Sequence, residues 1–194
     1  MNLTPKILGL ALVALVAATP AAAQDTKSSF HVGLNGTYAM DGLHNITNNY
    51  TGYSAEVGYT GHLANTTVPF RTTLSFEKFA GKVEDGFEQS LTGVQLAGDL
   101  IIHTGAAHLD IITGISINKW DLKTNPTPEP LVPGVPDKDP AKGTKFGARL
   151  GLELNFNDHW AGSFMIQATE LGTTRNANSG VNPSWYQFGI KYHF

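Results

Sequence analysis

The chain has 194 residues, no cysteine and a formal net charge of −3, with 13 Lys and Arg against 16 Asp and Glu. This balance provides no basic surface for a polyanion, so we expect no nucleic-acid partner. The lack of cysteine excludes a disulfide-stapled domain, thiolate chemistry and a cysteine-ligated metal.

The first residues have the pattern of a secretory signal peptide. Lys6 precedes an apolar run over residues 7–18, and the alanines at 21–23 supply an A-x-A cleavage pattern. The run is too short to span a bilayer. We therefore expect residues 1–23 to be a signal peptide and residues 24–194, with a formal charge of −4, to form one domain. A retained anchor is the alternative.

Eight segments of the remaining chain alternate large apolar with polar or small residues, the period of β-strands that present one face to each of two environments. No run reaches the roughly 18 apolar residues of a membrane helix, which excludes a helical membrane protein but not a barrel. In chain order the predicted strands cover residues 30–38, 53–63, 68–77, 94–102, 108–118, 146–156, 160–169 and 185–194.

Short and long connections alternate between these strands. Three are tight, at residues 64–67, 104–107 and 157–159, whereas four are long, at residues 40–52, 78–89, 120–143 and 171–183. An up-and-down meander with its long loops at one end is typical of transmembrane barrels of the bacterial outer membrane. We therefore predict an all-β fold, an eight-stranded antiparallel up-and-down transmembrane β-barrel.

The polar face argues against a soluble barrel, which would turn its apolar face inward around a ligand. It carries charges of both signs among Gly, Ser and Thr, and opposite charges can pair in the filled lumen of a small barrel. An ordinary solvated face is the alternative. The lumen network that we predict consists of Glu56, Arg71, Glu77, Asp99, Asp110, Arg149, Glu153 and Lys191.

The apolar face ends in aromatic residues near the strand termini, where interfacial girdles lie: Phe30, Tyr53, Phe76, Phe146, Phe156, Trp160 and Tyr192. The closing segment YQFGIKYHF continues the alternation to the last residue, through Tyr186, Phe188, Ile190, Tyr192 and Phe194. With this architecture and this terminal pattern, the chain resembles the small eight-stranded outer-membrane barrels of the OmpA/OmpX and opacity-like type.

The resemblance implies an exported, monomeric protein of the outer membrane, in contact with membrane lipid and lipopolysaccharide. It also implies that the five alternating residues of the last strand are the signal read by the outer-membrane assembly machinery. The implied role is structural or a surface interaction carried by four extracellular loops. The third loop holds six prolines between Pro126 and Pro140 and is a candidate for presenting a surface ligand, or else only a mobile segment.

Two other functions stay open. A narrow porin-like channel for small solutes needs a continuous water path through the lumen. A lipid-modifying enzyme needs a base that reaches a hydroxyl, but no His-x-Ser occurs and the nearest candidates, His108, Asp110 and Ser116, fall on the inward face. We expect no enzyme activity and no cofactor.

Six of the seven histidines fall at the turn end of the predicted barrel: His31, His62, His103, His108, His159 and His193. Because the first and last strands pair in a closed barrel, His31 and His193 should be inward-pointing neighbours. They are the candidate for a proton-sensitive or metal-binding mouth. The alternative, which we favour from the sequence, is that these imidazoles lie in the headgroup zone and that the protein holds no metal.

Overall fold

The computed structural model describes residues 29–40, 43, 50–63, 66, 68–81, 83–84, 87–106, 108–125, 143–169 and 184–194. The predicted signal peptide lies outside these residues, as do most of the first and fourth predicted loops and the Pro-rich part of the third. The strands are β1 (Ser29–Ala39), β2 (Thr51–His62), β3 (Pro69–Phe79), β4 (Val83–Glu84), β5 (Phe87–His103), β6 (Leu109–Asn125), β7 (Gly143–Asn155), β8 (Trp160–Thr169) and β9 (Ser184–His193).

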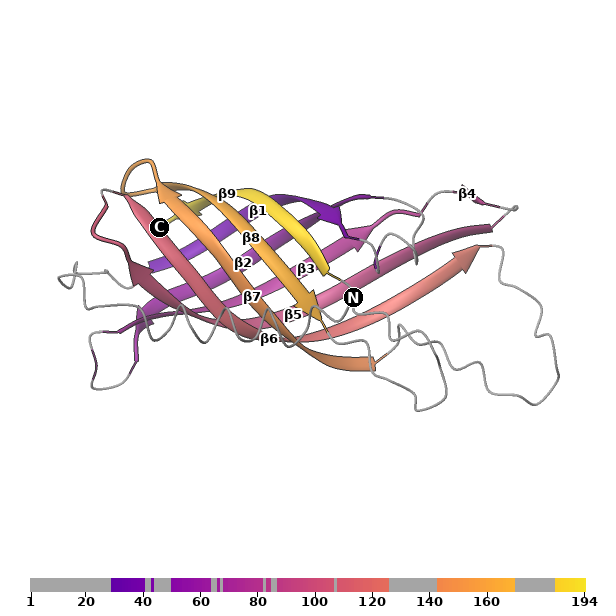
Figure 1. The fold of residues 1–194 in the computed structure, drawn as a ribbon, viewed down its shortest axis with the longest axis horizontal. Helices are drawn as coiled ribbons and strands as arrows, with labels where there is room; N and C mark the ends of the chain where they lie inside the picture. The colour runs from indigo at the N-terminus through magenta and orange to yellow at the C-terminus, as the bar shows by residue number, and fades with distance from the viewer. Residues whose placement is uncertain are drawn as a thin grey trace.

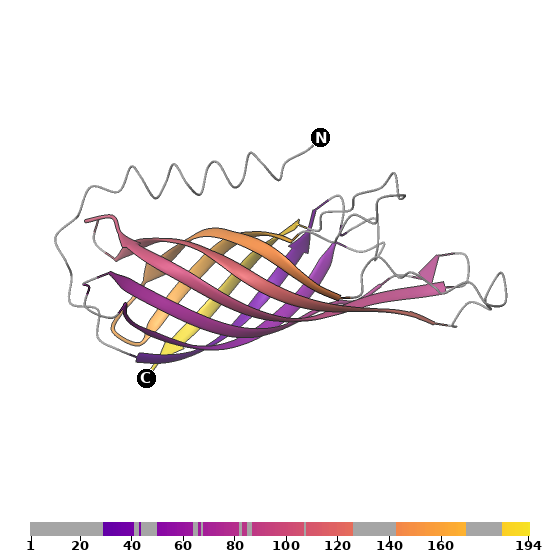
Figure 2. The same cartoon turned by 90° about the horizontal axis from the view of Figure 1, so that it is seen from below.

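Eight of these strands form one closed antiparallel barrel (Figures 1 and 2). Strands that are adjacent in sequence pair with each other, except that β3 pairs with β5 instead of β4. β1 pairs with β9 from His31↔His193 to Ala39↔Trp185, which closes the barrel. β4 is a two-residue addition that pairs only with β5, outside the barrel wall. The structure confirms the predicted eight-stranded antiparallel barrel. Within the described part of the chain, no helix is both long and apolar enough to cross a membrane.

The two faces of the wall are reversed relative to a soluble protein. Large apolar side chains point outward, with exposed fractions of 67 % for Leu34, 71 % for Ile115 and 70 % for Phe146. The inward positions hold Ser, Thr, Asn, Gln and charged residues, almost all of them buried. A continuous exposed apolar band of this kind is stable only when its surroundings are themselves apolar.

The seven predicted aromatic-girdle residues all lie on the outward face, six of them with more than two fifths of their surface exposed. Several meet across neighbouring strands, as Phe30 and Tyr59 do with ring centroids 5.0 Å apart. Trp160 and Tyr192 make a T-shaped contact at 5.1 Å. These contacts form the girdle at what we call the turn end, where β2 joins β3, β5 joins β6 and β7 joins β8. The opposite end of the barrel is the loop end.

Two predicted loops were wrong in their bounds. The sequence pattern places residues 78–89 and 120–143 in loops, but in the structure β3 continues to Phe79, β5 begins at Phe87 and β6 continues to Asn125. β5 and β6 have 17 residues each, against 10 to 13 for the other barrel strands. Apolar alternation stops where a strand leaves the apolar band, whereas backbone pairing continues past it. The pair therefore projects beyond the loop end, with β4 beside it (Figures 1 and 2).

Candidate functional site

The barrel interior gathers the charged residues of the chain's polar face. None of the eight residues of the predicted lumen network is more than 7 % exposed. The interior of an eight-stranded barrel is just wide enough to be filled by the inward-pointing side chains. Buried charges are costly unless they are paired and hydrogen-bonded. The pairing of these eight charged residues therefore decides whether the lumen is a packed core or a continuous water path.

The turn-end half of the lumen holds one compact ionic cluster. The Arg71 guanidinium donates two hydrogen bonds to the Glu153 carboxylate, with Nη1 to Oε2 at 2.7 Å and Nη2 to Oε1 at 2.6 Å. Lys191 Nζ lies 3.0 Å from Glu153 Oε2 and 3.2 Å from Glu56 Oε1. Two cations and two carboxylates thus neutralise one another across β2, β3, β7 and β9.

A chain of side-chain amides crosses the middle of the lumen. Gln95 Nε2 donates to Asn118 Oδ1 at 2.7 Å and to Gln167 Oε1 at 2.8 Å. Gln167 Nε2 donates to Gln187 Oε1, and Gln187 Nε2 donates to Ser54 Oγ at 3.0 Å. Asn35 Nδ2 then donates to Ser54 Oγ at 3.1 Å and to Glu56 Oε2 at 3.2 Å, which joins the amides to the ionic cluster.

The other four charged residues of the predicted network do not join the ionic cluster. Arg149 donates from Nη1 to Gln95 Oε1 at 3.1 Å, and its Nε lies 3.5 Å from Asp99 Oδ1. Asp110 lies at the turn end, 2.6 Å from His103 Nδ1. Glu77 is fully buried, and neither of its carboxylate oxygens has a hydrogen-bond partner among the described residues.

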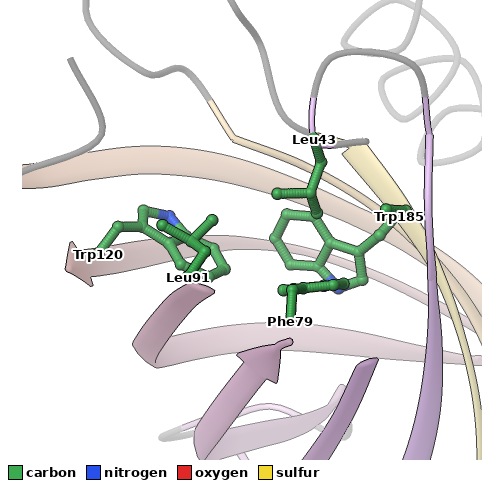
Figure 3. Packing of buried hydrophobic residues seen from close by; sticks show 6 residues of the cluster. Leu43, Phe79, Leu91, Trp120 and Trp185 are labelled. Atoms are coloured by element: carbon green, nitrogen blue, oxygen red, sulfur yellow. The ribbon is translucent and has the colours of Figure 1, made fainter. Parts of the chain in front are cut away.

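An apolar cluster is buried at the loop end of the lumen, and Figure 3 shows how its side chains pack. The Trp120 and Trp185 rings meet edge to face with centroids 5.5 Å apart, and the Phe79 ring lies 6.0 Å from Trp185 and 6.4 Å from Trp120. All are almost fully buried. We call this cluster the aromatic plug; its members are Ala39, Leu43, Phe79, Leu91, Trp120 and Trp185.

The sequence pattern does not predict the plug, because it places Phe79 and Trp120 in loops. The signal that could have revealed the plug is the alternation of inward-pointing positions along the strands. Ser116 and Asn118 point inward, and the next position of that period is Trp120. Likewise, Ser75 and Glu77 lead to Phe79. A second inward apolar group, Ile101, Ile112 and Met165, fills the lumen toward the turn end.

The histidines of the turn end do not share one environment. His31 is fully buried inside the barrel, so the headgroup placement favoured from the sequence is wrong for this residue. Its ring lies over Gly58, where a Cβ would meet His31 Cε1 at 2.3 Å. The His31 and His193 ring centroids are 5.6 Å apart. His159 lies at the surface, with Nδ1 3.0 Å from the His193 carbonyl oxygen.

The candidate catalytic residues do not converge. Asp110 contacts His103 and accepts a hydrogen bond from Asn155 Nδ2 at 2.9 Å, whereas Ser116 Oγ accepts from the Asn118 amide. His108 occupies the turn before β6, with φ of 71°. Among the described residues, no three or more His, Cys, Asp or Glu side chains gather closely enough to hold a metal ion.

The alternating residues of the last strand lie on the outward face of β9. Phe188, Ile190 and Phe194 are more than half exposed, and Phe164 contacts Phe188 with ring centroids 5.0 Å apart. The Phe194 backbone N–H donates to the Phe30 carbonyl oxygen at 2.9 Å, which extends the pairing of β1 with β9 by one residue. The segment is thus an integral barrel strand.

Comparisons with known proteins agree with this architecture. Residues 8–194 match the family model described as the outer membrane protein beta-barrel domain. Among solved structures, Neisserial surface protein A (NspA) is similar with a TM-score of 0.58 and 9 % identity, over 87 % of this chain and 100 % of that one. No curated protein matches the sequence.

A second similar structure is the Yersinia pestis outer membrane protein Ail in a phospholipid bilayer nanodisc, with a TM-score of 0.52 and 9 % identity, over 87 % of this chain and 100 % of that one. At such identities the likeness shows the fold alone. The family match and the outward apolar band together place the barrel wall in lipid. The chain belongs to the outer membrane protein beta-barrel domain family and resides in the outer membrane.

Proposed function

We propose that the protein is a surface-interaction protein whose barrel holds a projecting sheet edge outside the membrane. The observation that carries this proposal is the length of β5 and β6. Their pairing continues from Gly93↔Trp120 to Glu88↔Asn125, whereas β7 pairs with β6 only as far as Trp120. Residues 121–125 of β6 therefore have no strand on their β7 side within the described chain.

An open strand edge is a template for an added strand. Its unpaired N–H and C=O groups bind the backbone of an extended peptide, and the side chains along it give preference for particular partners. Asp121 and Lys123, both exposed, provide charges of both signs beside this edge. The partner that fits is an extended segment of a surface-exposed or secreted protein.

Strand addition can be tested with the barrel in nanodiscs and an array of extended octapeptides, each paired with an N-methylated copy that cannot form the backbone ladder. We expect binding to the plain peptides only, with slower amide hydrogen exchange confined to residues 121–125. Equal binding of the N-methylated copies, or no change in exchange at these residues, contradicts strand addition.

The filled lumen favours this role over the alternative of a narrow channel. The ionic cluster, the amide chain and the aromatic plug occupy successive levels of the interior. We therefore infer that the barrel does not conduct. Planar bilayers containing the purified protein should stay at the baseline conductance, and discrete open-channel steps would establish the channel instead.

We further infer that the protein is a monomer without enzymatic activity and that the outer-membrane assembly machinery recognises β9. The inference about β9 is supported by the outward alternation of Phe188, Ile190 and Phe194. Replacing Phe194 by Ala should reduce the yield of assembled barrel, seen as the fast-migrating unheated form on SDS gels. Replacing Phe156, another phenylalanine that is more than half exposed, by Ala is the matched control in a turn, with no loss expected.

A further inference from the structure

The seam between the first and last strands ends in a pair of histidines. His31 of β1 and His193 of β9 are direct register partners, the pair of that ladder nearest the turn end. The backbone is anchored on both sides of His193, because its N–H donates to the His159 carbonyl oxygen at 2.7 Å and Phe194 N–H donates to Phe30. The two imidazoles are therefore held next to each other where the barrel closes, with their ring planes tilted by 39°.

Three of the four ring nitrogens of this pair lack a hydrogen-bond partner among the described residues. His31 is fully buried, yet neither Nδ1 nor Nε2 has a partner among the described residues, and the same holds for the buried Nε2 of His193. A neutral imidazole always carries one donor and one acceptor nitrogen. Burying these nitrogens without a partner is unfavourable. The arrangement therefore favours a bound species that takes the lone pair of an unprotonated ring nitrogen, as a metal ion does.

We propose that His31 and His193 together bind a nitrogen-preferring transition-metal ion across the β1–β9 seam. The ring centroids are 5.6 Å apart. With metal–nitrogen bonds of about 2.0–2.1 Å, two imidazoles on one ion place their centroids roughly 5 to 6 Å apart, so the observed spacing fits a bent N–metal–N arrangement. Such an ion links the first and last strands of the barrel.

The neighbouring side chains decide how many ligands the protein supplies. Glu56 Oε1 lies 3.7 Å from His31 Nε2 but also 3.2 Å from Lys191 Nζ, which holds this carboxylate in the ionic cluster. Two imidazoles are thus the protein ligands, and water completes the coordination. This is consistent with the absence of any three-residue metal cluster among the described residues.

The donor set and the local charge determine which ions fit. Two imidazoles favour Cu²⁺ most strongly, followed by Ni²⁺ and Zn²⁺, whereas Ca²⁺ and Mg²⁺ require oxygen ligands. The nearby cations Arg71 and Lys191 are already paired with Glu153 and Glu56, so they leave little net positive charge to repel a metal ion.

The test uses the full barrel in nanodiscs without a polyhistidine tag. Titration with Cu²⁺, followed by electron paramagnetic resonance, should give one saturable equivalent with coupling to two nitrogens. His31→Gln and His193→Ala should each weaken binding at least tenfold, and His62→Ala, which removes an exposed imidazole from the same end, should leave it unchanged. Ca²⁺ should not compete.

A second readout tests the link between the strands. Cu²⁺ or Ni²⁺ should raise the temperature at which the fast-migrating folded form is lost on SDS gels, and His193→Ala should abolish this rise. His193 is the last residue of β9, so we expect His193→Ala to fold even if His31→Gln does not. The His193→Ala variant therefore tests the site by itself. The proposal is overturned if the parent binds no Cu²⁺ equivalent beyond that retained by His193→Ala.

Discussion

The Arg71 guanidinium and the Glu153 carboxylate meet in a two-point hydrogen bond inside the barrel, although the two residues are 82 positions apart in sequence. They come from β3 and β7, which are separated in the wall by β5 and β6. Both side chains are almost fully buried. The pair therefore ties opposite parts of the wall together through the lumen.

Breaking this pair from one side should be costly. Glu153→Gln removes the carboxylate from both Arg71 and Lys191 and leaves the buried guanidinium without its partner. We expect a loss of about 3–5 kcal/mol in the free energy of unfolding, measured by urea titration of the barrel in lipid vesicles. Asp121→Asn, at an exposed carboxylate, should change it by no more than about 0.5 kcal/mol. Equal values for the two variants would show that the pair contributes no stability.

The aromatic plug depends on a glycine across from Trp120. Gly93 is the register partner of Trp120, and a Cβ there would meet the Trp120 ring at 2.4 Å. Gly93→Ala should therefore displace the ring and destabilise the barrel by about 1–3 kcal/mol. Gly36→Ala is the matched control, because a Cβ at Gly36 of β1 meets nothing within 4 Å. Near-ultraviolet circular dichroism of the tryptophans, recorded during urea unfolding, measures both the displacement of the ring and the loss of stability. An unaltered spectrum for Gly93→Ala would contradict the close packing of Gly93 against Trp120.

The plug should also control access from outside. Because the chain has no cysteine, Ser75→Cys places a single thiol on the inward face of β3, two inward positions below Phe79. In an otherwise unchanged barrel we expect a charged methanethiosulfonate reagent to leave this thiol unmodified over hours.

Adding Trp120→Ala and Trp185→Ala removes the two largest plug side chains, and the thiol should then react at least tenfold faster. Retention of the fast-migrating form on unheated gels checks that the variant is folded. Rapid reaction of the Ser75→Cys thiol with the plug intact would mean that the loop end of the lumen is open.

Among the described residues of the β5–β6 turn, His108 is the one non-glycine residue with a left-handed backbone conformation. His108 has φ of 71°, a left-handed conformation that favours glycine over residues with a side chain. His108→Gly should therefore raise the free energy of unfolding by about 0.5–1 kcal/mol. His62→Gly, in the extended conformation of β2, should lower it instead. A decrease for His108→Gly would show that its side chain contributes more to the turn than the strain costs.

The residue pattern was sufficient for the wall of the barrel. An alternation of period two commits each residue to one face, and lipid on one side with a narrow interior on the other demands opposite chemistry of the two faces. The inward positions of Glu56, Arg149 and Lys191 and the outward position of Phe146 follow from this local rule. The neighbour relation of His31 and His193 follows from closure alone.

Pairing inside the lumen could not be derived in this way. Arg71 is the register partner of Asp99, yet its guanidinium reaches across the lumen to Glu153, and Asp99 lies beside Arg149 instead. The choice depends on the tilt and stagger of the strands around the closed barrel, which no single segment encodes. The same holds for the aromatic plug, because strands extend as far as their backbones find partners, beyond the point at which apolar alternation marks them.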